Sequence, residues 1–224
     1  MSRLLPMILL ALLVGPVCAK PVTVDLTVGE AYVYTLQNGD TKRITLVSYG
    51  EKRDIFRDAV RDATVEIDVD GTKAVLGVAL YNLPRVVNGV KVDAAVTQGY
   101  LSNSGSPEVW DLEPGADARL RFWDPGQPPL KPGTFTYPVK QRWFASDTQM
   151  ANDPCYVDGG EDPTRKSIYY HYALDFGGYD HLVPVVAATD GEVVSSAGEI
   201  ASDIPEDEKG FVHPRYDVVY IRDG

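Results

Sequence analysis

The sequence predicts a mostly-β protein, with an N-terminal β-sandwich-like module followed by a second, antiparallel β-sheet core. Apolar and polar residues alternate over 22–28, which is the period-two pattern of a half-buried strand. Three dipeptides suited to tight hairpin turns follow at short spacing, Asn38-Gly39, Asp70-Gly71 and Asn88-Gly89, because these residue types accept positive φ. Short strands joined by such turns are typical of a β-sandwich or a small barrel.

Residues 1–19 are expected to be a signal peptide. Arg3 precedes an apolar run over 4–14, and Val17-Cys18-Ala19 has the small-residue pattern of a signal-peptidase site. The run is shorter than the roughly 20 residues that a membrane-spanning helix needs. We therefore expect a secreted, periplasmic or cell-envelope protein with no membrane span after cleavage. A membrane anchor or a lipid on Cys18 is the alternative.

The charge and cysteine content of the mature chain limit its partners and its scaffold. Removal of residues 1–19 takes away one basic residue and leaves 20 basic against 32 acidic residues, a net charge of −12. This acidity argues against nucleic acid or an anionic lipid surface as the partner. Cys155 is the single cysteine that remains, so no disulfide forms within the mature chain.

The N-terminal module is expected to cover residues 20–124 and to place a hairpin around each turn dipeptide. The strands flanking these turns are expected at 33–35 and 44–46, at 65–69 and 74–80, and at 86–87 and 90–92. The segment 51–63 is the one helix expected in this module. This expectation rests on the spacing of its apolar residues Ile55, Val60 and Ala63.

A run rich in proline and glycine follows the N-terminal module. Residues 123–133 hold four prolines and two glycines, a composition that sustains neither a helix nor a β-ladder. We expect a stiff linker over 125–134; a long ordered loop inside one domain is the alternative.

The second module is expected to cover residues 135–224. Its strands are expected at 135–139, at 143–144, in the segment that carries His171, on the two sides of a hairpin turn at Asp190-Gly191, and at 218–221. Native proteins rarely leave the edge of a buried strand uncovered. We therefore expect the gene product to continue beyond Gly224.

His171 and Asp175 are the most informative residues of the second module. Imidazole and carboxylate are both ligands for zinc. On a straight strand, residues four apart are roughly 13 Å from each other, whereas each ligand of one zinc lies about 2 Å from the ion. A shared metal therefore requires a bend, with His171 on a loop or bulge and Asp175 in the strand. The alternative is an exposed histidine and an aspartate that makes turn hydrogen bonds.

From His171 onward the chain resembles the lysostaphin/LytM-type zinc metallopeptidases, which hydrolyse peptides of bacterial peptidoglycan. His171 and Asp175 precede Gly177-Gly178, as in the first motif of that family. Residues 184–194, Pro-Val-Val-Ala-Ala-Thr-Asp-Gly-Glu-Val-Val, are similar to its segment Pro-Val-Tyr-Ala-Ala-Ala-Asp-Gly-Val-Val, and 217–224 are similar to its next core strand and turn.

The resemblance covers roughly residues 135–224. It implies an antiparallel β-sheet metallopeptidase core, two Zn²⁺ ligands at His171 and Asp175, and a peptidoglycan peptide as the substrate. In that mechanism zinc lowers the pKa of its bound water and polarises the scissile carbonyl, while a downstream histidine acts as general base.

The remaining catalytic residues of the family have no counterpart in this chain. Its members carry a Tyr-x-His-Leu-like segment and a His-x-His pair, which supply the third ligand and the histidines that handle protons. His181 and His213 lie in neither motif. A catalytic zinc has three protein ligands and a water. We therefore expect the core to be incomplete, with no catalytic residue in this stretch, and the activity to belong to the full-length gene product.

Non-enzymatic functions are the alternatives. Some LytM-type domains lack the zinc residues and activate other cell-wall hydrolases. In a second alternative, the whole chain is an adhesion or carbohydrate-binding β-protein, and His171 and Asp175 have no functional role. The N-terminal module is left with three possible roles, to bind cell-wall glycan, to shield the active-site groove or to space it from the surface.

Several other residues have both a functional and a structural interpretation. Cys155 is a small buried residue, a thiolate that blocks the zinc, or a disulfide partner for the missing tail. Tyr169, Tyr170 and Tyr172 either line a groove or belong to the core. His181 is a substrate contact or a solvated loop histidine.

Overall fold

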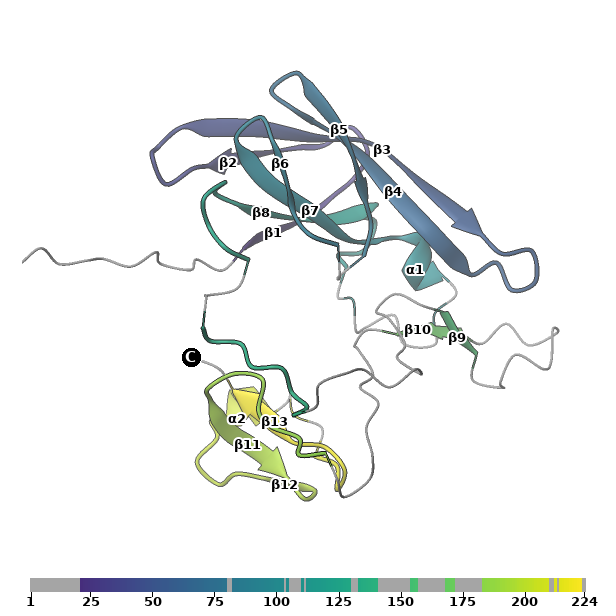
Figure 1. The fold of residues 1–224 in the computed structure, drawn as a ribbon. Helices are drawn as coiled ribbons and strands as arrows, with labels where there is room; N and C mark the ends of the chain where they lie inside the picture. The colour runs from purple at the N-terminus through teal and green to yellow at the C-terminus, as the bar shows by residue number, and fades with distance from the viewer. Residues whose placement is uncertain are drawn as a thin grey trace, which may run out of the picture.

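The structure is a computed structural model. It describes residues 21–79, 82–102, 104, 110, 112–129, 133–140, 154–156, 168–171, 183–209, 212 and 214–222. Within these residues the chain forms antiparallel β-sheets and two four-residue helices, α1 (Gly99–Ser102) and α2 (Glu206–Lys209) (Figure 1). The prediction of a mostly-β fold is confirmed. The predicted signal peptide lies outside the described residues.

Two four-stranded sheets form the N-terminal module. One has the order β1-β8-β7-β6 and the other the order β2-β3-β4-β5. Their strands are β1 (Val22–Leu26), β2 (Ala31–Thr35), β3 (Thr41–Arg53), β4 (Val60–Val69), β5 (Thr72–Gly77), β6 (Arg85–Val87), β7 (Val90–Thr97) and β8 (Ala118–Trp123). Figure 1 shows the sheets one over the other.

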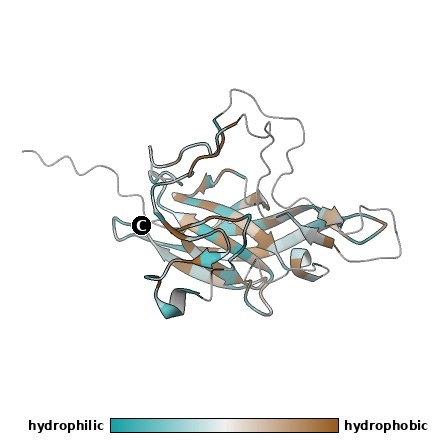
Figure 2. Cartoon of the chain, turned by 90° about the horizontal axis from the view of Figure 1, so that it is seen from below, coloured by the Kyte–Doolittle hydropathy of each residue, from teal (hydrophilic) through white to brown (hydrophobic). Residues whose placement is uncertain are grey.

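A single hydrophobic core lies between these two sheets. Alternate residues of β4, among them Val65 and Ile67, are buried in it together with Leu120 and Phe122 of β8. Phe122 stacks on Tyr32 of the opposite sheet, with ring centroids 5.7 Å apart. Figure 2 shows the corresponding alternation of hydrophobic and hydrophilic residues along the strands. Period-two patterning thus places one face of each sheet in the core, as in a β-sandwich.

Two of the predicted hairpin turns have the expected backbone geometry. Asp70 and Gly71 have φ of 46° and 83°, and Asn88 and Gly89 have φ of 43° and 83°. Each dipeptide joins two paired strands directly, so both positions need the positive φ of a type I′ turn. The hairpin at Asn38-Gly39 is also present, with a longer loop over 36–40.

The prediction of a helix over 51–63 is wrong. β3 continues to Arg53 and pairs with β4, which starts at Val60. A short turn between them is held by the Asp54 carboxylate, which accepts hydrogen bonds from the backbone N–H groups of residues 56 and 57 at 3.0 and 2.7 Å. Ile55, counted as apolar helix face, is 91% exposed. Sheet pairing here outweighs a weak helical spacing.

The beginning of the predicted linker lies against the N-terminal module. The Asp124 carboxylate accepts hydrogen bonds from the Tyr34 hydroxyl and the Gln37 backbone N–H, both at 2.9 Å. Gln127 is buried, and its carbonyl accepts a hydrogen bond from the Lys91 ammonium. Residues 130–132 lie outside the described residues. The assignment of 125–134 as a boundary between two modules stays a prediction.

A three-stranded antiparallel sheet forms the last part of the chain. Its order is β12-β11-β13, with β11 (Glu192–Ser196), β12 (Glu199–Ile200) and β13 (Tyr220–Arg222). β13 corresponds to the strand predicted at 218–221. The predicted strand at 143–144 lies outside the described residues. Neither described helix is long and apolar enough to cross a membrane.

Asp190-Gly191 is not the hairpin turn that the sequence predicts. Residues 184–188 exchange backbone hydrogen bonds with 136–140, whereas β11 pairs with β12 and β13. Gly191 is needed for a different reason, because a Cβ there would lie 2.5 Å from the carbonyl oxygen of Arg222. Asp190-Gly191 therefore connects the segment 184–188, which pairs with 136–140, to β11, which pairs with β12 and β13.

The turn at Gly71 provides a test of this fold. Replacing Gly71 with Ala should reduce the free energy of unfolding by about 1–2 kcal/mol, because the new Cβ meets no atom within 4 Å but must accept positive φ. Urea denaturation of the chain measures this change. Gly126→Ala is the matched control, since Gly126 is equally open but has no positive φ. Equal destabilisation by both variants would contradict the assigned turn.

Candidate functional site

The candidate metal ligand His171 lies at the end of a short strand. β9 (Pro154–Tyr156) and β10 (Ile168–Tyr170) form a two-stranded antiparallel sheet, in which Tyr170 pairs with Pro154. His171 follows β10 directly, is not part of the strand and is half-buried. Asp175 lies outside the described residues. The two predicted ligands are therefore not brought together within the part of the chain that the structure describes, and their pairing stays a prediction.

The strand before His171 is docked on the N-terminal module. Ile168 and Tyr170 are both 0% exposed and belong to the hydrophobic core of that module. Because residues two apart share one face of a strand, β10 turns this face toward the module. Ile168 also forms a parallel bridge with Ser104, and β10 lies beneath α1 (Figure 1). The core interpretation is confirmed for Tyr170.

Tyr170 makes two specific contacts in this core. Its hydroxyl accepts a hydrogen bond of 2.8 Å from the backbone N–H of Val60, the first residue of β4. Its ring meets the ring of Tyr100 edge-on, with centroids 4.8 Å apart and planes at 77°. This is one of the preferred geometries of aromatic pairs. The two contacts hold the phenol at both its polar end and its ring.

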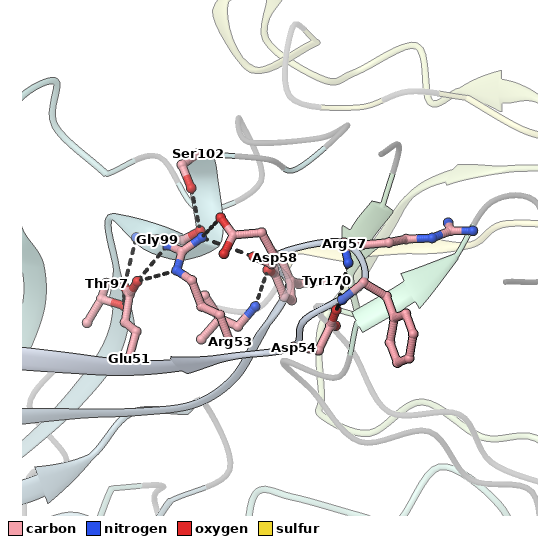
Figure 3. Close-up of polar contacts among 11 residues, drawn as sticks. Glu51, Arg53, Asp54, Arg57, Asp58, Thr97, Gly99, Ser102 and Tyr170 are labelled. Carbon is pink, nitrogen blue, oxygen red and sulfur yellow. Dashed lines mark hydrogen bonds and ion pairs between the residues drawn. The ribbon is translucent and has the colours of Figure 1, made fainter. Parts of the chain in front are cut away.

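A charged network supports the neighbours of Tyr170 (Figure 3). The part-buried Glu51 carboxylate accepts hydrogen bonds from the Thr97 hydroxyl at 2.6 Å and from the Gly99 backbone N–H at 2.9 Å. It also accepts a hydrogen bond of 2.6 Å from the Arg53 guanidinium. A Cβ on Gly99 would lie 1.9 Å from a carboxylate oxygen of Glu51. A side chain at this position, where α1 starts one residue before Tyr100, would therefore displace the Glu51 carboxylate.

Burial keeps Tyr170 neutral, and Glu51 keeps the neighbouring Arg53 charged. Burial raises the pKa of Tyr170 to about 12, against the lowering effects of the Val60 hydrogen bond and of Arg53. Burial also opposes the charge on Arg53, yet the hydrogen bond and charge of Glu51 raise the pKa of its guanidinium. At neutral pH the phenol is thus a hydrogen-bonding group, and Glu51 and Arg53 form a part-buried ion pair.

Of the other residues singled out in the sequence, some lie among the described residues and some do not. Cys155 is 7% exposed and lies opposite Tyr169 in the sheet, which agrees with a small buried residue. The side chain of Tyr169 is not among those described. Tyr172, His181 and His213 also lie outside the described residues.

Sequence reasoning missed Glu51 and Arg53 because they were assigned to a helix. On a strand, a Glu and an Arg two residues apart share one face. The pair Glu51-x-Arg53 would therefore have indicated an ion pair if 51–63 had been taken as strand and turn. No sequence pattern connects this pair with Tyr170, because their proximity arises from tertiary packing.

The donor set fits zinc in kind, but the described residues do not complete a site. An imidazole nitrogen and a carboxylate oxygen are both accepted by zinc. Among the described residues, no group of three or more His, Cys, Asp or Glu side chains lies close enough to hold a metal ion. His171 and Asp175 would thus supply two ligands and need a third from elsewhere.

Comparison with known proteins does not assign the chain to a family. No family model, no curated protein and no solved structure matches it. The likeness to the lysostaphin/LytM-type metallopeptidases therefore rests on the motifs described above.

The raised pKa of Tyr170 predicts a loss of stability in alkali. An unfolded tyrosine ionises near pH 10, whereas native Tyr170 keeps its proton up to a pKa of about 12. The proton on native Tyr170 contributes stability in full below pH 10, and this contribution of about 2 kcal/mol is lost as the pH rises to 12. Urea denaturation at several pH values should show a shallower decline for Tyr170→Phe.

Tyr216→Phe is the control for this measurement, because the Tyr216 side chain is 88% exposed and its environment changes little on unfolding. Tyr34, whose pKa burial also raises to about 12, accounts for part of the remaining decline. An unchanged slope between pH 10 and 12 in Tyr170→Phe would show that its phenol is not buried as described.

Proposed function

We propose that the chain is the exported N-terminal part of a zinc-dependent endopeptidase that hydrolyses peptide bonds of bacterial peptidoglycan. The proposal combines the sequence motifs with one observation, the anchoring of the strand that directly precedes His171. Ile168 and Tyr170 fix this strand in a hydrophobic core. A metal ligand needs such a fixed backbone, whereas a solvated loop histidine does not.

The last sheet of the chain supports the same proposal. The resemblance implies an antiparallel β-core built from the segments at 184–194 and 217–224. β11 and β13 come from these segments and pair with each other, Val193 opposite Ile221. This antiparallel pairing supports an antiparallel core of the kind that the resemblance implies.

His171 and Asp175 are the residues that would hold the ion. When bound, zinc supplies a water of lowered pKa and polarises the scissile carbonyl. The imidazole of His171 must be neutral to bind a metal, so its protonation opposes binding. The N-terminal module contributes by holding the backbone before His171.

The product of the complete gene provides the direct test. His171→Ala and Asp175→Ala should each lose bound zinc, measured by mass spectrometry of the metal content. Each should also reduce dye release from labelled, purified sacculi by more than about 100-fold, because even the loss of a partner of a metal ligand costs 10–100-fold. Unchanged hydrolysis by both variants would refute the proposal.

His213→Ala is the control, because His213 belongs to no motif of the resembling family; it should keep both zinc and activity. The same measurements identify the alternative functions. Wild-type protein that sediments with sacculi but holds no zinc is a cell-wall-binding β-protein. Wild-type protein that holds no zinc and stimulates a separate cell-wall hydrolase is a non-enzymatic activator.

A further inference from the structure

We propose that the chain associates with a second copy of itself, because the tip of one hairpin of the N-terminal module fits an apolar pocket of another molecule. The hairpin tip is the segment 54–59 between β3 and β4, and Phe56 is the residue that inserts. The pocket lies between β5, the segment 82–85 and β7. This inference is independent of the proposed function.

The hairpin tip exposes two large apolar side chains. Ile55 is 91% and Phe56 73% exposed, whereas the next residue, Arg57, is 3% exposed. Figure 1 shows this loop projecting past α1 at the far end of β3 and β4. A charged residue inside and an apolar pair outside is the reverse of the usual distribution. Single exposed apolar residues need no explanation, but an adjacent pair at a projecting tip indicates an interaction site.

Hydrogen bonds hold the tip in a defined conformation. The Asp54 carboxylate accepts hydrogen bonds from the backbone N–H groups of residues 56 and 57 at 3.0 and 2.7 Å. The Arg53 guanidinium donates to the carbonyl and to the carboxylate of Asp58, both at 3.1 Å. These bonds fix the backbone on both sides of Phe56. Little conformational entropy is therefore lost when the tip binds.

The hairpin has no net charge around its tip. Residues 51–62 include four basic and four acidic residues, in a chain with a net charge of −11. Ion pairs of 2.6–3.2 Å join several of these charges within the hairpin: Lys52 with Asp62, Arg53 with Glu51, and Arg61 with Asp54. The tip therefore recognises a partner through Ile55 and Phe56 and not through charge.

The pocket offers an apolar surface to such a tip. Its volume is about 230 Å³, and its lining includes Leu76 and Val92, which are 2% and 0% exposed. Leu83, which also lines the pocket, is 83% exposed. A cavity of this size is smaller than the roughly 300–1,000 Å³ of small-molecule sites. It suits a single large side chain, and an aromatic anchor in a pocket is the usual centre of a protein interface.

Two charged residues line the same pocket, and each has a partner within the module. The Asp93 carboxylate accepts hydrogen bonds of 2.9 and 2.6 Å from Arg121. The Arg85 guanidinium donates a hydrogen bond of 2.6 Å to the Val75 carbonyl. Because these groups are already paired, an apolar side chain can enter without leaving them unsatisfied.

Phe56 cannot reach the pocket of its own molecule. Leu76 pairs with Val65, five residues beyond the first residue of β4, Val60. At about 3.4 Å per residue, this places Leu76 roughly 17 Å from the start of β4, and the tip precedes that start. β4 is paired with β3 on one edge and with β5 on the other, so the hairpin does not fold back. The side chain that fills the pocket therefore comes from a second molecule.

The size of this contact sets its strength and its response to salt. An aromatic side chain buries about 150–250 Å², well below the roughly 1,200–2,000 Å² of a stable interface. The association is therefore weak and reversible. Two copies with a net charge of −11 each repel one another, and salt screens this repulsion. Association through an apolar tip should thus become stronger as the salt concentration rises.

Sedimentation velocity of the mature chain, between about 10 μM and 1 mM, tests the association. We expect the average sedimentation coefficient to rise with concentration, and more steeply in 0.5 M than in 0.05 M NaCl. Phe56→Ser and Leu83→Ser should each lower the association constant by about tenfold or more. The double variant should lower it no further, because both changes remove the same contact. Both side chains are exposed, so the urea midpoints should stay at the wild-type value.

Val33→Thr is the matched control, because Val33 is 51% exposed in the same module but belongs to neither the tip nor the pocket. It should change the association constant by less than about twofold. Photo-crosslinking locates the contact directly. With p-benzoylphenylalanine in place of Phe56, and a mixture of ¹⁵N-labelled and unlabelled chains, we expect cross-links between copies in peptides that contain Leu83 or Val92.

Several results would overturn the inference. These are a chain that stays monomeric at 1 mM in 0.5 M NaCl, an association constant that Phe56→Ser leaves unchanged, or cross-links that avoid the pocket. A monomeric chain that binds phosphatidylcholine vesicles through Phe56 would also overturn it, and would identify a lipid surface as the partner of the tip. Association that is lost in Phe56→Ser and in Leu83→Ser, but kept in Val33→Thr, supports it.

Discussion

The buried contact between Tyr170 and Val60 joins parts of the chain that are 110 residues apart. It couples a three-residue strand to a core built from two four-stranded sheets. Ile168 and Tyr170 of this strand are fully buried in that core, so the core sets the position of the strand. The candidate ligand His171 directly follows this strand. The backbone directly before His171 is therefore positioned by packing on the N-terminal module.

Charged residues in the N-terminal module are used mainly to fix strands to one another. Arg119 pairs with Asp25, and Arg121 with Asp93, each directly across neighbouring strands. Burial raises the pKa of Asp93, while Arg121 opposes this shift. Such part-buried pairs specify register, because a slip by one residue would leave each carboxylate without its partner. The Glu51 network applies the same principle to the contact between β3 and α1.

Features that depend on local residue types could be predicted from the sequence, whereas those that arise from tertiary packing could not. The turns at Asp70-Gly71 and Asn88-Gly89 follow from the φ that only a few residue types accept. The wrong helix over 51–63 arose because Val60 and Ala63 have the i, i+3 spacing of a helix face. In the structure both are buried in β4, where the pairing with β3 has a register shift at Lys52/Arg53. The motif at His171 indicated a ligand, but nothing in its sequence indicated that Tyr170 would contact residues more than 100 positions earlier. Docking surfaces of this kind have no periodic pattern.

The N-terminal module is synthesised before β10, and this order affects how the chain folds. A polypeptide emerges N-terminus first, and domains generally fold as units in that order. Val60 and Tyr100, which contact β10, are therefore synthesised before Ile168. β10 then packs on an N-terminal module that has already folded. Closing such a long loop costs entropy, so the docking of β10 should be among the last events of folding.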